Sequence, residues 1–322
     1  MTGENLPQRK GRGPFGRGDW QANGFSLGAA LMAWIGLALL LYPSAASWFS
    51  AVEQSRIVVS YTNEVGSGVD PSSAEQIRSA HEYNKALNTG AVLEANQRLP
   101  TGKGKTTDSG LNYDTLLRTD TSSVMARIRI PAIGVDLPVY HGTSDETLLT
   151  GIGHLQGTSL PVGGVNTHSV LTGHRGLATA AMFTDLNLVK AGDTFSISVF
   201  DQVLTYRVIS STVVEPDQTE SLRPMAGMDL VTLVTCTPLG INSQRILVTG
   251  ERVSPTPVSD VAAARVRPDP GFPWWAVWFA AGTLLVLLYA WRSGYPPRRP
   301  VRSATVEPVG AAAGSAAATL PG

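Results

Sequence analysis

Two long apolar runs and a series of short ones divide the chain. Segments 25–42 and 274–291 contain no Asp, Glu, Lys, Arg or His, and each is long enough to cross a hydrocarbon layer of about 30 Å as a helix. Aromatic residues lie near the ends of the second run, where a membrane interface favours them. The pattern predicts two membrane-spanning helices, at 25–43 and 274–291.

Between these runs, residues 124–253 show short apolar or alternating stretches separated by Gly, Pro and Asp. This spacing is typical of an antiparallel β-barrel or β-sandwich. A mainly β catalytic domain is therefore predicted over 122–255. Its predicted strands are 126–130, 135–140, 169–172, 194–200, 203–214, 230–235 and 245–253.

The region 44–121 is predicted to be helical, with one long loop. Asp70, Pro71 and Glu75 form a helix-start pattern, which predicts a helix that ends near Leu87. The polar, glycine-rich stretch 94–110 is predicted to be a loop, and long loops in compact proteins are often lids. The proline-rich stretch 256–273 is predicted to be a linker to the second span.

The tails 1–24 and 292–322 hold too little apolar surface to fold alone and are predicted to be disordered. Lys and Arg next to a span are retained in the cytoplasm, so both termini are predicted to be cytoplasmic and residues 44–273 to lie outside the plasma membrane. Alternatively, the first run is a signal peptide cleaved near Ser44 and Ala46, and the second run still anchors the chain. The basic residues concerned are Arg9, Lys10, Arg12, Arg17, Arg292, Arg298, Arg299 and Arg302.

The 25 basic and 25 acidic side chains give a net charge of zero, so no overall field favours nucleic acid, and none is expected as a partner. Charged residues make up 16% of the chain and hydrophobic residues 43%, which suits a globular domain with membrane segments. No cluster of Cys and His has the spacing of metal ligands. Neither a metal nor a cofactor is predicted, and the scattered acidic residues leave a calcium site open.

The only cysteine, Cys236, lies in the part predicted to be outside the membrane, where thiols normally pair. A small buried apolar residue is the commonest role of a free cysteine. Here, however, Cys236 ends an apolar run and is followed by Thr237 and Pro238, which favours the end of a strand. The sequence therefore predicts a thiol exposed at the mouth of the β domain.

A cation and a histidine are expected beside this thiol. A hairpin between 230–235 and 245–253 places Arg245 opposite Cys236, and a nearby cation favours the reactive thiolate. The five donors of its guanidinium suit an oxyanion or a substrate carbonyl. Arg175 is a rival, because it is adjacent to the candidate histidine.

His174 is the best candidate for proton transfer, because it follows an apolar run and lies between Gly173 and Gly176, which permit close approach to another element. A lone histidine is more often structural than catalytic. The other four histidines remain alternatives on sequence grounds: His81, His141, His154 and His168.

These residues lie in motifs that resemble a known family. The segment 232–245 (TLVTCTPLGINSQR) is similar to the Thr-Leu-x-Thr-Cys signature of sortases and the arginine that follows it, and 130–186 resembles the class C branch almost throughout. The resemblance covers roughly 124–253, and two spans agree with class C. It implies a sortase-type closed β-barrel of about eight strands with short helices and a site of Cys236, His174 and Arg245.

The resemblance also implies an activity. A class C sortase is a cysteine transpeptidase that cleaves an LPxTG-like signal between Thr and Gly, forms a thioacyl enzyme and transfers it to an amine, here expected to be a pilin lysine. One alternative is a sortase that attaches proteins to a cell-wall precursor or mainly hydrolyses. Another is a catalytically silent, membrane-tethered binding module. A papain-like protease is disfavoured, because its cysteine precedes its histidine.

One departure concerns the lid. Class C relatives usually carry an Asp-Pro-aromatic motif before the barrel, and 94–110 contains none. The same stretch contains Leu99, Pro100, Thr101 and Gly102, which resemble a sorting signal shortened by one residue. The hypothesis is an internal pseudosubstrate, and the alternative is a chance match.

Overall fold

The computed structural model describes residues 20–21, 23–69, 71–88, 105–106, 111–119 and 122–295. The chain divides into two compact units, residues 1–36 with 281–322 and residues 37–280. Most of both predicted disordered tails, and most of the predicted lid 94–110, lie outside the described residues. Those expectations stay predictions.

Two long helices carry the apolar runs. Helices α1 (Gly24–Ser67) and α5 (Trp274–Ser293) are long and apolar enough to cross a membrane, judged by length and composition. The two helical segments expected on either side of residue 43 form one helix, which continues through Pro43. The sequence suggested a division there because the apolar run ends at Tyr42, although proline normally interrupts a helix.

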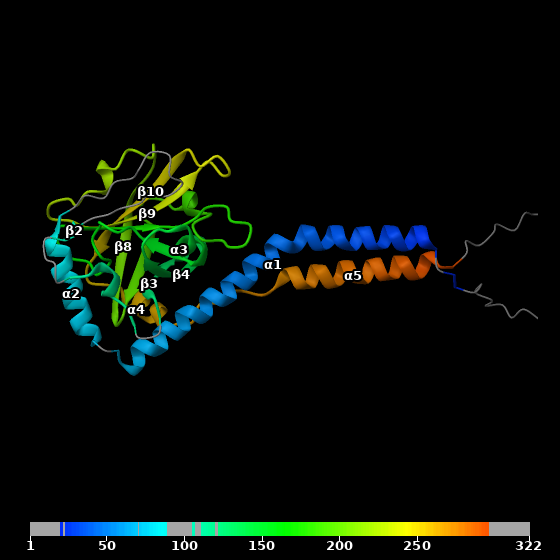
Figure 1. The fold of residues 1–322 in the computed structure, drawn as a ribbon, viewed down its shortest axis with the longest axis horizontal. Helices are drawn as coiled ribbons and strands as arrows, with labels where there is room; N and C mark the ends of the chain where they lie inside the picture. Colours follow the sequence, from blue (N-terminus) through cyan, green and yellow to red (C-terminus); the bar gives the residue numbers. More distant parts are fainter. Residues whose placement is uncertain are drawn as a thin grey trace, which may run out of the picture. The chain divides into compact units, whose positions relative to one another are not determined.

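The second unit contains a closed barrel of eight strands (Figure 1). Around the barrel the order is β10, β8, β7, β3, β4, β5, β6, β9, and β9 pairs with β10 to close it. The prediction of a closed barrel of about eight strands is confirmed. The strands are β3 (Val124–Ile130), β4 (Val135–His141), β5 (Ile152–His154), β6 (Thr167–Thr172), β7 (Thr194–Val199), β8 (Gln202–Val214), β9 (Asp229–Thr237) and β10 (Gln244–Val253).

The barrel is mixed rather than wholly antiparallel. Strand β5 runs parallel to β4, and β6 runs parallel to β9, while the other pairs in the barrel are antiparallel. The purely antiparallel prediction was wrong at these two pairs. Strand β5 has only three residues, too few for an alternating pattern, and it follows the short helix α3 (Asp145–Thr150).

Apolar side chains fill the barrel, and one helix extends the core outside it. Ile128, Ile197 and Leu233 are fully buried inside one large cluster, which Tyr83 of α2 (Ser73–Ala86) joins. Helix α2 is the helix predicted before Leu87, but its cap is Ser72, whose hydroxyl accepts from the Glu75 amide. The candidate cap Asp70 lies outside the described residues.

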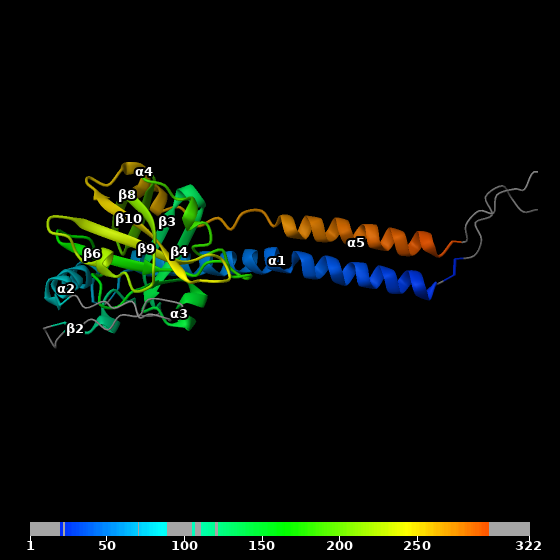
Figure 2. The same ribbon diagram turned by 90° about the horizontal axis from the view of Figure 1, so that it is seen from above.

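Short elements cover the ends and sides of the barrel. Figure 2 shows α4 (Val258–Ala264) on one side of it and α2 on the other. The short ladder of β1 (Leu87–Asn88) and β2 (Lys105–Thr106) lies partly within the predicted loop. The described residues of the unit also form four 3-10 helices: η1 (Tyr113–Thr115), η2 (Pro131–Ile133), η3 (Leu186–Leu188) and η4 (Glu220–Leu222).

The predicted linker 256–273 is bound to the barrel. Arg127 of β3 is 3% exposed, makes two 2.6 Å contacts with the Asp136 carboxylate, and donates to the carbonyls of Ala264 and Val266 at 2.7 and 2.8 Å. Thr205 of β8 donates to Asp260 of α4 at 2.7 Å. Residues 256–273, called the exit segment below, are therefore an ordered part of the domain.

Replacing Arg127 by alanine should destabilise the barrel and release this exit segment. We expect the free energy of unfolding to fall by about 2–3 kcal/mol, because the change removes the buried partner of Asp136 and leaves two carbonyls without their donor. Thermal unfolding of the full chain in detergent would measure the loss, and trypsin cleavage after Arg265 would report release.

The matched control for this change is Arg129→Ala. Arg129 contacts the same carboxylate at 3.2 Å but is 25% exposed, so its loss should cost less and leave the exit segment protected. Equal losses for the two variants, or no additional trypsin cleavage in Arg127→Ala, would contradict this account of the exit segment.

Candidate active site

Cys236 and Arg245 face each other across two paired strands. Cys236 is the second-last residue of β9, and Arg245 is the second residue of β10. They are direct partners in the antiparallel register. Because such partners point to the same face of a sheet, the thiol and the guanidinium lie on one face, as the hairpin argument predicts.

That face is the outer face of the barrel. Val231 and Leu233 of β9 belong to the main core, whereas Val234 belongs to a second buried cluster. Since side chains alternate along a strand, Cys236 lies on the same side as Val234. An apolar patch therefore adjoins the thiol, formed by Leu155, Val170, Leu222, Val234 and Leu247.

His174 approaches from the other neighbour of β9. Strand β6 runs parallel to β9 with Thr172 opposite Val234, and the Gly173 amide donates to the Val234 carbonyl at 3.0 Å. Continued by two residues, this register brings His174 to the level of Cys236. Of the three residues predicted from sequence, Cys236 and Arg245 thus lie on the adjacent strands β9 and β10, and His174 lies two residues after the end of β6.

The backbone before and after His174 is fixed by specific bonds. The Thr235 hydroxyl donates to the Gly173 carbonyl at 2.7 Å, and the Phe183 amide donates to the His174 carbonyl at 3.0 Å. A Cβ at Gly173 would lie 2.7 Å from Ile152 and 2.8 Å from Phe183, so no larger residue fits. Sequence reasoning missed Thr235 as a positioning residue, although it directly precedes the cysteine.

The thiol is buried, which corrects the prediction of an exposed cysteine. Cys236 is 4% exposed and packs against Leu148 of α3. This burial raises the pKa of the Cys236 thiol, and the positive charge of Arg245 lowers it. The thiol therefore depends on neighbouring cations for its conversion to thiolate.

The two candidate arginines have different surroundings. Arg245 is 3% exposed, and its Nη1 donates to the carbonyls of Asn242 and Gln244, both at 3.0 Å. Arg175 donates to Thr184, Thr237 and Asn187. Arg245 is thus the arginine opposite the thiol, while Arg175 connects segments beside it.

Three of the alternative histidines have structural partners. Burial lowers the pKa of His154 to about 4 and lowers the pKa of His141 and His168 as well, so these rings are neutral at physiological pH. His81 lies on α2, beside a separate cavity. The contacts are His141 Nε2 with Leu116 O (2.7 Å), His154 Nδ1 with Tyr113 Oη (2.9 Å), His154 Nε2 with Ser159 O (2.9 Å), and His168 Nε2 with Thr232 Oγ1 (2.7 Å).

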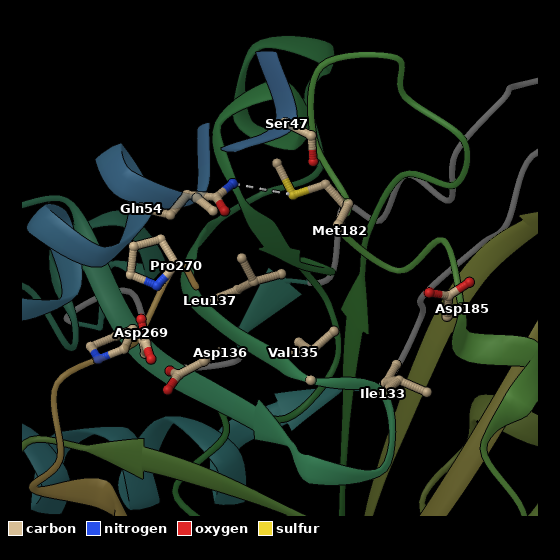
Figure 3. Close-up of a pocket in the computed structure, with 14 residues that line it drawn as sticks. Ser47, Gln54, Ile133, Val135, Asp136, Leu137, Met182, Asp185, Asp269 and Pro270 are labelled. Carbon is tan, nitrogen blue, oxygen red and sulfur yellow. Dashed lines mark hydrogen bonds between the residues drawn. The ribbon is translucent and has the colours of Figure 1, made fainter. Parts of the chain in front are cut away.

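A different cavity, of about 110 Å³, lies where α1, the start of β4 and the exit segment meet (Figure 3). Gln54 and Met182 face each other across it, with Gln54 Nε2 donating to Met182 Sδ at 3.5 Å. No Cys, His or Arg lines it, so it is not the site of Cys236.

Two expectations concern what else the site holds. Among the described residues there is no group of three or more His, Cys, Asp or Glu that could hold a metal. The segment Leu99 to Gly102 lies outside the described residues, and the pseudosubstrate hypothesis stays a prediction.

Comparison with known proteins identifies the family of this chain. Residues 128–253 match the sortase domain. The solved structure of sortase C-1 from Actinomyces oris is 50% identical over 56% of this chain and 99% of its own, with a TM-score of 0.50. This chain belongs to the sortase family.

Other relatives of this sortase extend the comparison. The solved sortase C of Streptococcus pneumoniae is 37% identical over 63% of this chain and 100% of its own, with a TM-score of 0.55. Sortase A of Bacillus anthracis is 29% identical over 42% of this chain, and the match spans 62% of that relative's length. The similar solved structures are thus class C sortases, which confirms the resemblance seen in the sequence.

Thr235→Val should weaken the site with little change of shape. Valine has nearly the volume of threonine but leaves the buried Gly173 carbonyl without its donor, which costs about 1–3 kcal/mol. The midpoint temperature of thermal unfolding and the alkylation rate of Cys236 would measure the effect, and both should fall. Thr235→Ser keeps the donor and should retain most of both, so equal losses in the two variants would contradict the assignment.

The alkylation of Cys236 should depend on pH and on Arg245. Because burial raises the pKa of the thiol and only the thiolate reacts, removing the cation should raise this pKa further. In Arg245→Met the midpoint of the alkylation profile should therefore move to higher pH, and the rate at neutral pH should fall. Arg245→Lys keeps a positive charge and should shift the midpoint of the profile less. Mass spectrometry after iodoacetamide treatment provides the profile, and an unchanged midpoint in Arg245→Met would refute the electrostatic role.

Proposed function

We propose that this sortase is a class C-like cysteine transpeptidase that joins proteins carrying an LPxTG-like signal to an amine. The observation that carries the proposal is the register of β9 with its two neighbours, which aligns Cys236 with Arg245 and brings His174 to the same level. A nucleophile, a proton carrier and a fixed cation at one level are the parts that acyl transfer requires.

The first half-reaction forms a thioester. The Cys236 thiolate attacks the carbonyl carbon of the Thr–Gly bond, and the carbonyl oxygen becomes an oxyanion that the Arg245 guanidinium stabilises. As the tetrahedral intermediate collapses, the C–N bond breaks and His174, as imidazolium, gives its proton to the leaving amine. The products are a thioacyl enzyme and a peptide with a free glycine amine.

The second half-reaction transfers the acyl group. The incoming amine attacks the thioester carbonyl and loses a proton to His174, which restores the imidazolium. The C–S bond then breaks and releases the Cys236 thiolate, so the enzyme returns to its starting state. A new amide bond replaces the one that was cleaved.

A pilin lysine is the amine that we propose. The solved structures similar to this chain include a pilus-related sortase C of group B Streptococcus, and the Streptococcus pneumoniae sortase C is described in terms of pilin substrate specificity. The second candidate is attachment to a cell-wall precursor, which the more distant match to sortase A supports.

We also propose that α1 and α5 both span the plasma membrane, with the barrel outside it. Both helices have the length and apolar composition of spans, and basic residues flank their outer ends, Arg17 before α1 and Arg292 at the end of α5. The rule that basic flanks stay in the cytoplasm places both termini there. A barrel outside the membrane can reach exported proteins.

Mass spectrometry of the full chain in detergent tests the proposed reaction. With an LPxTG-type peptide, we expect a covalent adduct on Cys236 that Cys236→Ala abolishes and His174→Ala slows by about 10²- to 10⁴-fold, the usual contribution of acid–base catalysis. Adding a lysine-bearing pilin fragment should move the acyl group to the lysine.

Other results of this experiment would separate the alternatives. Transfer only to a cell-wall precursor amine, or hydrolysis alone, would replace the pilin assignment by the second candidate. Absence of any adduct in the wild-type chain would contradict the transpeptidase proposal and favour a binding module.

A further inference from the structure

The segment that carries His174 leaves the sheet and returns to it. It begins after β6 and reaches η3, and a sheet hydrogen bond holds it at Gly173. Contacts within the segment are local: the Gly176 amide donates to Thr184 Oγ1 at 3.1 Å, and Leu177 pairs with Ala180. The position of the imidazole therefore depends in part on the side chains that connect this segment to the barrel.

Arg175 provides that connection. Its Nη1 donates to Thr237 Oγ1 at 2.8 Å, its Nε to the Thr184 carbonyl at 3.0 Å, and its Nη2 to Asn187 Oδ1 at 2.8 Å. One side chain therefore connects both ends of the segment 173–184, called the histidine segment below, to Thr237, which directly follows Cys236. The three bonds use the planar fork of the guanidinium.

A close packing contact lies next to these bonds. Gly176 has φ +73°, and a Cβ there would collide with Leu239 Cδ2. Leu239 belongs to the turn that joins β9 to β10. The histidine segment is thus packed against the turn after the cysteine as well as hydrogen-bonded beside it.

The contacts of Arg175 indicate a geometric role. The charge that lowers the pKa of Cys236 is that of Arg245. Arg175 contacts neither ring nor thiol in its three bonds, and each bond ends on an oxygen that belongs to a segment it connects.

We propose that Arg175 is a positioning residue that keeps His174 in line with Cys236 by binding the histidine segment to Thr237. The inference rests on the proposed transpeptidase function, because it explains how that site keeps its geometry. It is separate from the role of Arg245, which lies on the other neighbour of the cysteine strand.

A double-mutant cycle in the full chain in detergent tests the proposal. Arg175→Ala and Thr237→Val should each lower the rate constant of acylation by an LPxTG-type peptide, by up to about 10²-fold, the usual cost of a small misplacement, with KM nearly unchanged. The double variant should be little slower than Arg175→Ala, because that single change already removes the bond to Thr237. Arg175→Lys keeps the charge but loses the fork, so it should restore only part of the rate.

Two further measurements make the result decisive. Arg207→Ala, which removes an exposed arginine of β8, should acylate as the wild type does. Hydrogen exchange of residues 173–184 needs no substrate, and it should rise in Arg175→Ala and in Thr237→Val while barrel strands keep their protection.

The outcomes separate this inference from the proposed function. If the wild type forms no adduct, the proposed function fails, and unchanged exchange at 173–184 would independently overturn the role of Arg175. If the wild type is acylated, additive losses in the cycle, an effect on KM alone, or full activity of Arg175→Ala would overturn the inference and leave the transpeptidase intact.

Discussion

The pairing of β9 with β6 on one side and β10 on the other is the constraint on which the site depends. The parallel pair with β6 sets the level of His174, and the antiparallel pair with β10 sets the level of Arg245. A shift of either register by one residue would turn a whole row of side chains to the opposite face. The barrel opposes such shifts, because β9 contributes Val231 and Leu233 to the main core.

This arrangement explains why a buried thiol suits the chemistry. Packing against Leu148 shields Cys236 from water and favours the neutral thiol, and a buried cysteine in apolar surroundings is normally inert. Arg245 opposes this effect from a fixed position in the sheet. Low solvent access strengthens the interaction between charge and sulfur, so the same burial that raises the pKa makes the geometry of the cation important.

The sequence predicted the parts of the structure that depend on local pattern. Alternating residues revealed seven of the eight barrel strands, and Thr237 and Pro238 marked the end of the cysteine strand. Strand β5 was missed because three residues show no period, and the two parallel pairs depend on how the chain crosses the barrel. The pairing of Cys236 with Arg245 across β9 and β10 could be predicted because the two strands form a hairpin, which is a local feature.

Features that depend on distant parts of the chain were not predictable from pattern. The burial of Cys236 comes from Leu148, which lies on a helix far from it in sequence. The docked exit segment depends on Arg127, a charged residue in a strand whose partners are more than 130 residues away. Arg127 shares its strand with Arg129, and a surface ion pair of either arginine would give the same pattern.

Arginines connect segments outside the sheet of this domain to the barrel. Arg127 holds the exit segment, Arg175 holds the histidine segment, and Arg245 binds carbonyls of the turn that precedes its own strand. A guanidinium stays charged at any physiological pH and presents donors in a fixed plane, so each connection has one preferred geometry. Lysine offers the same charge from a single flexible point. The barrel therefore sets the register of the strands, and the arginines fix segments outside the sheet relative to that register.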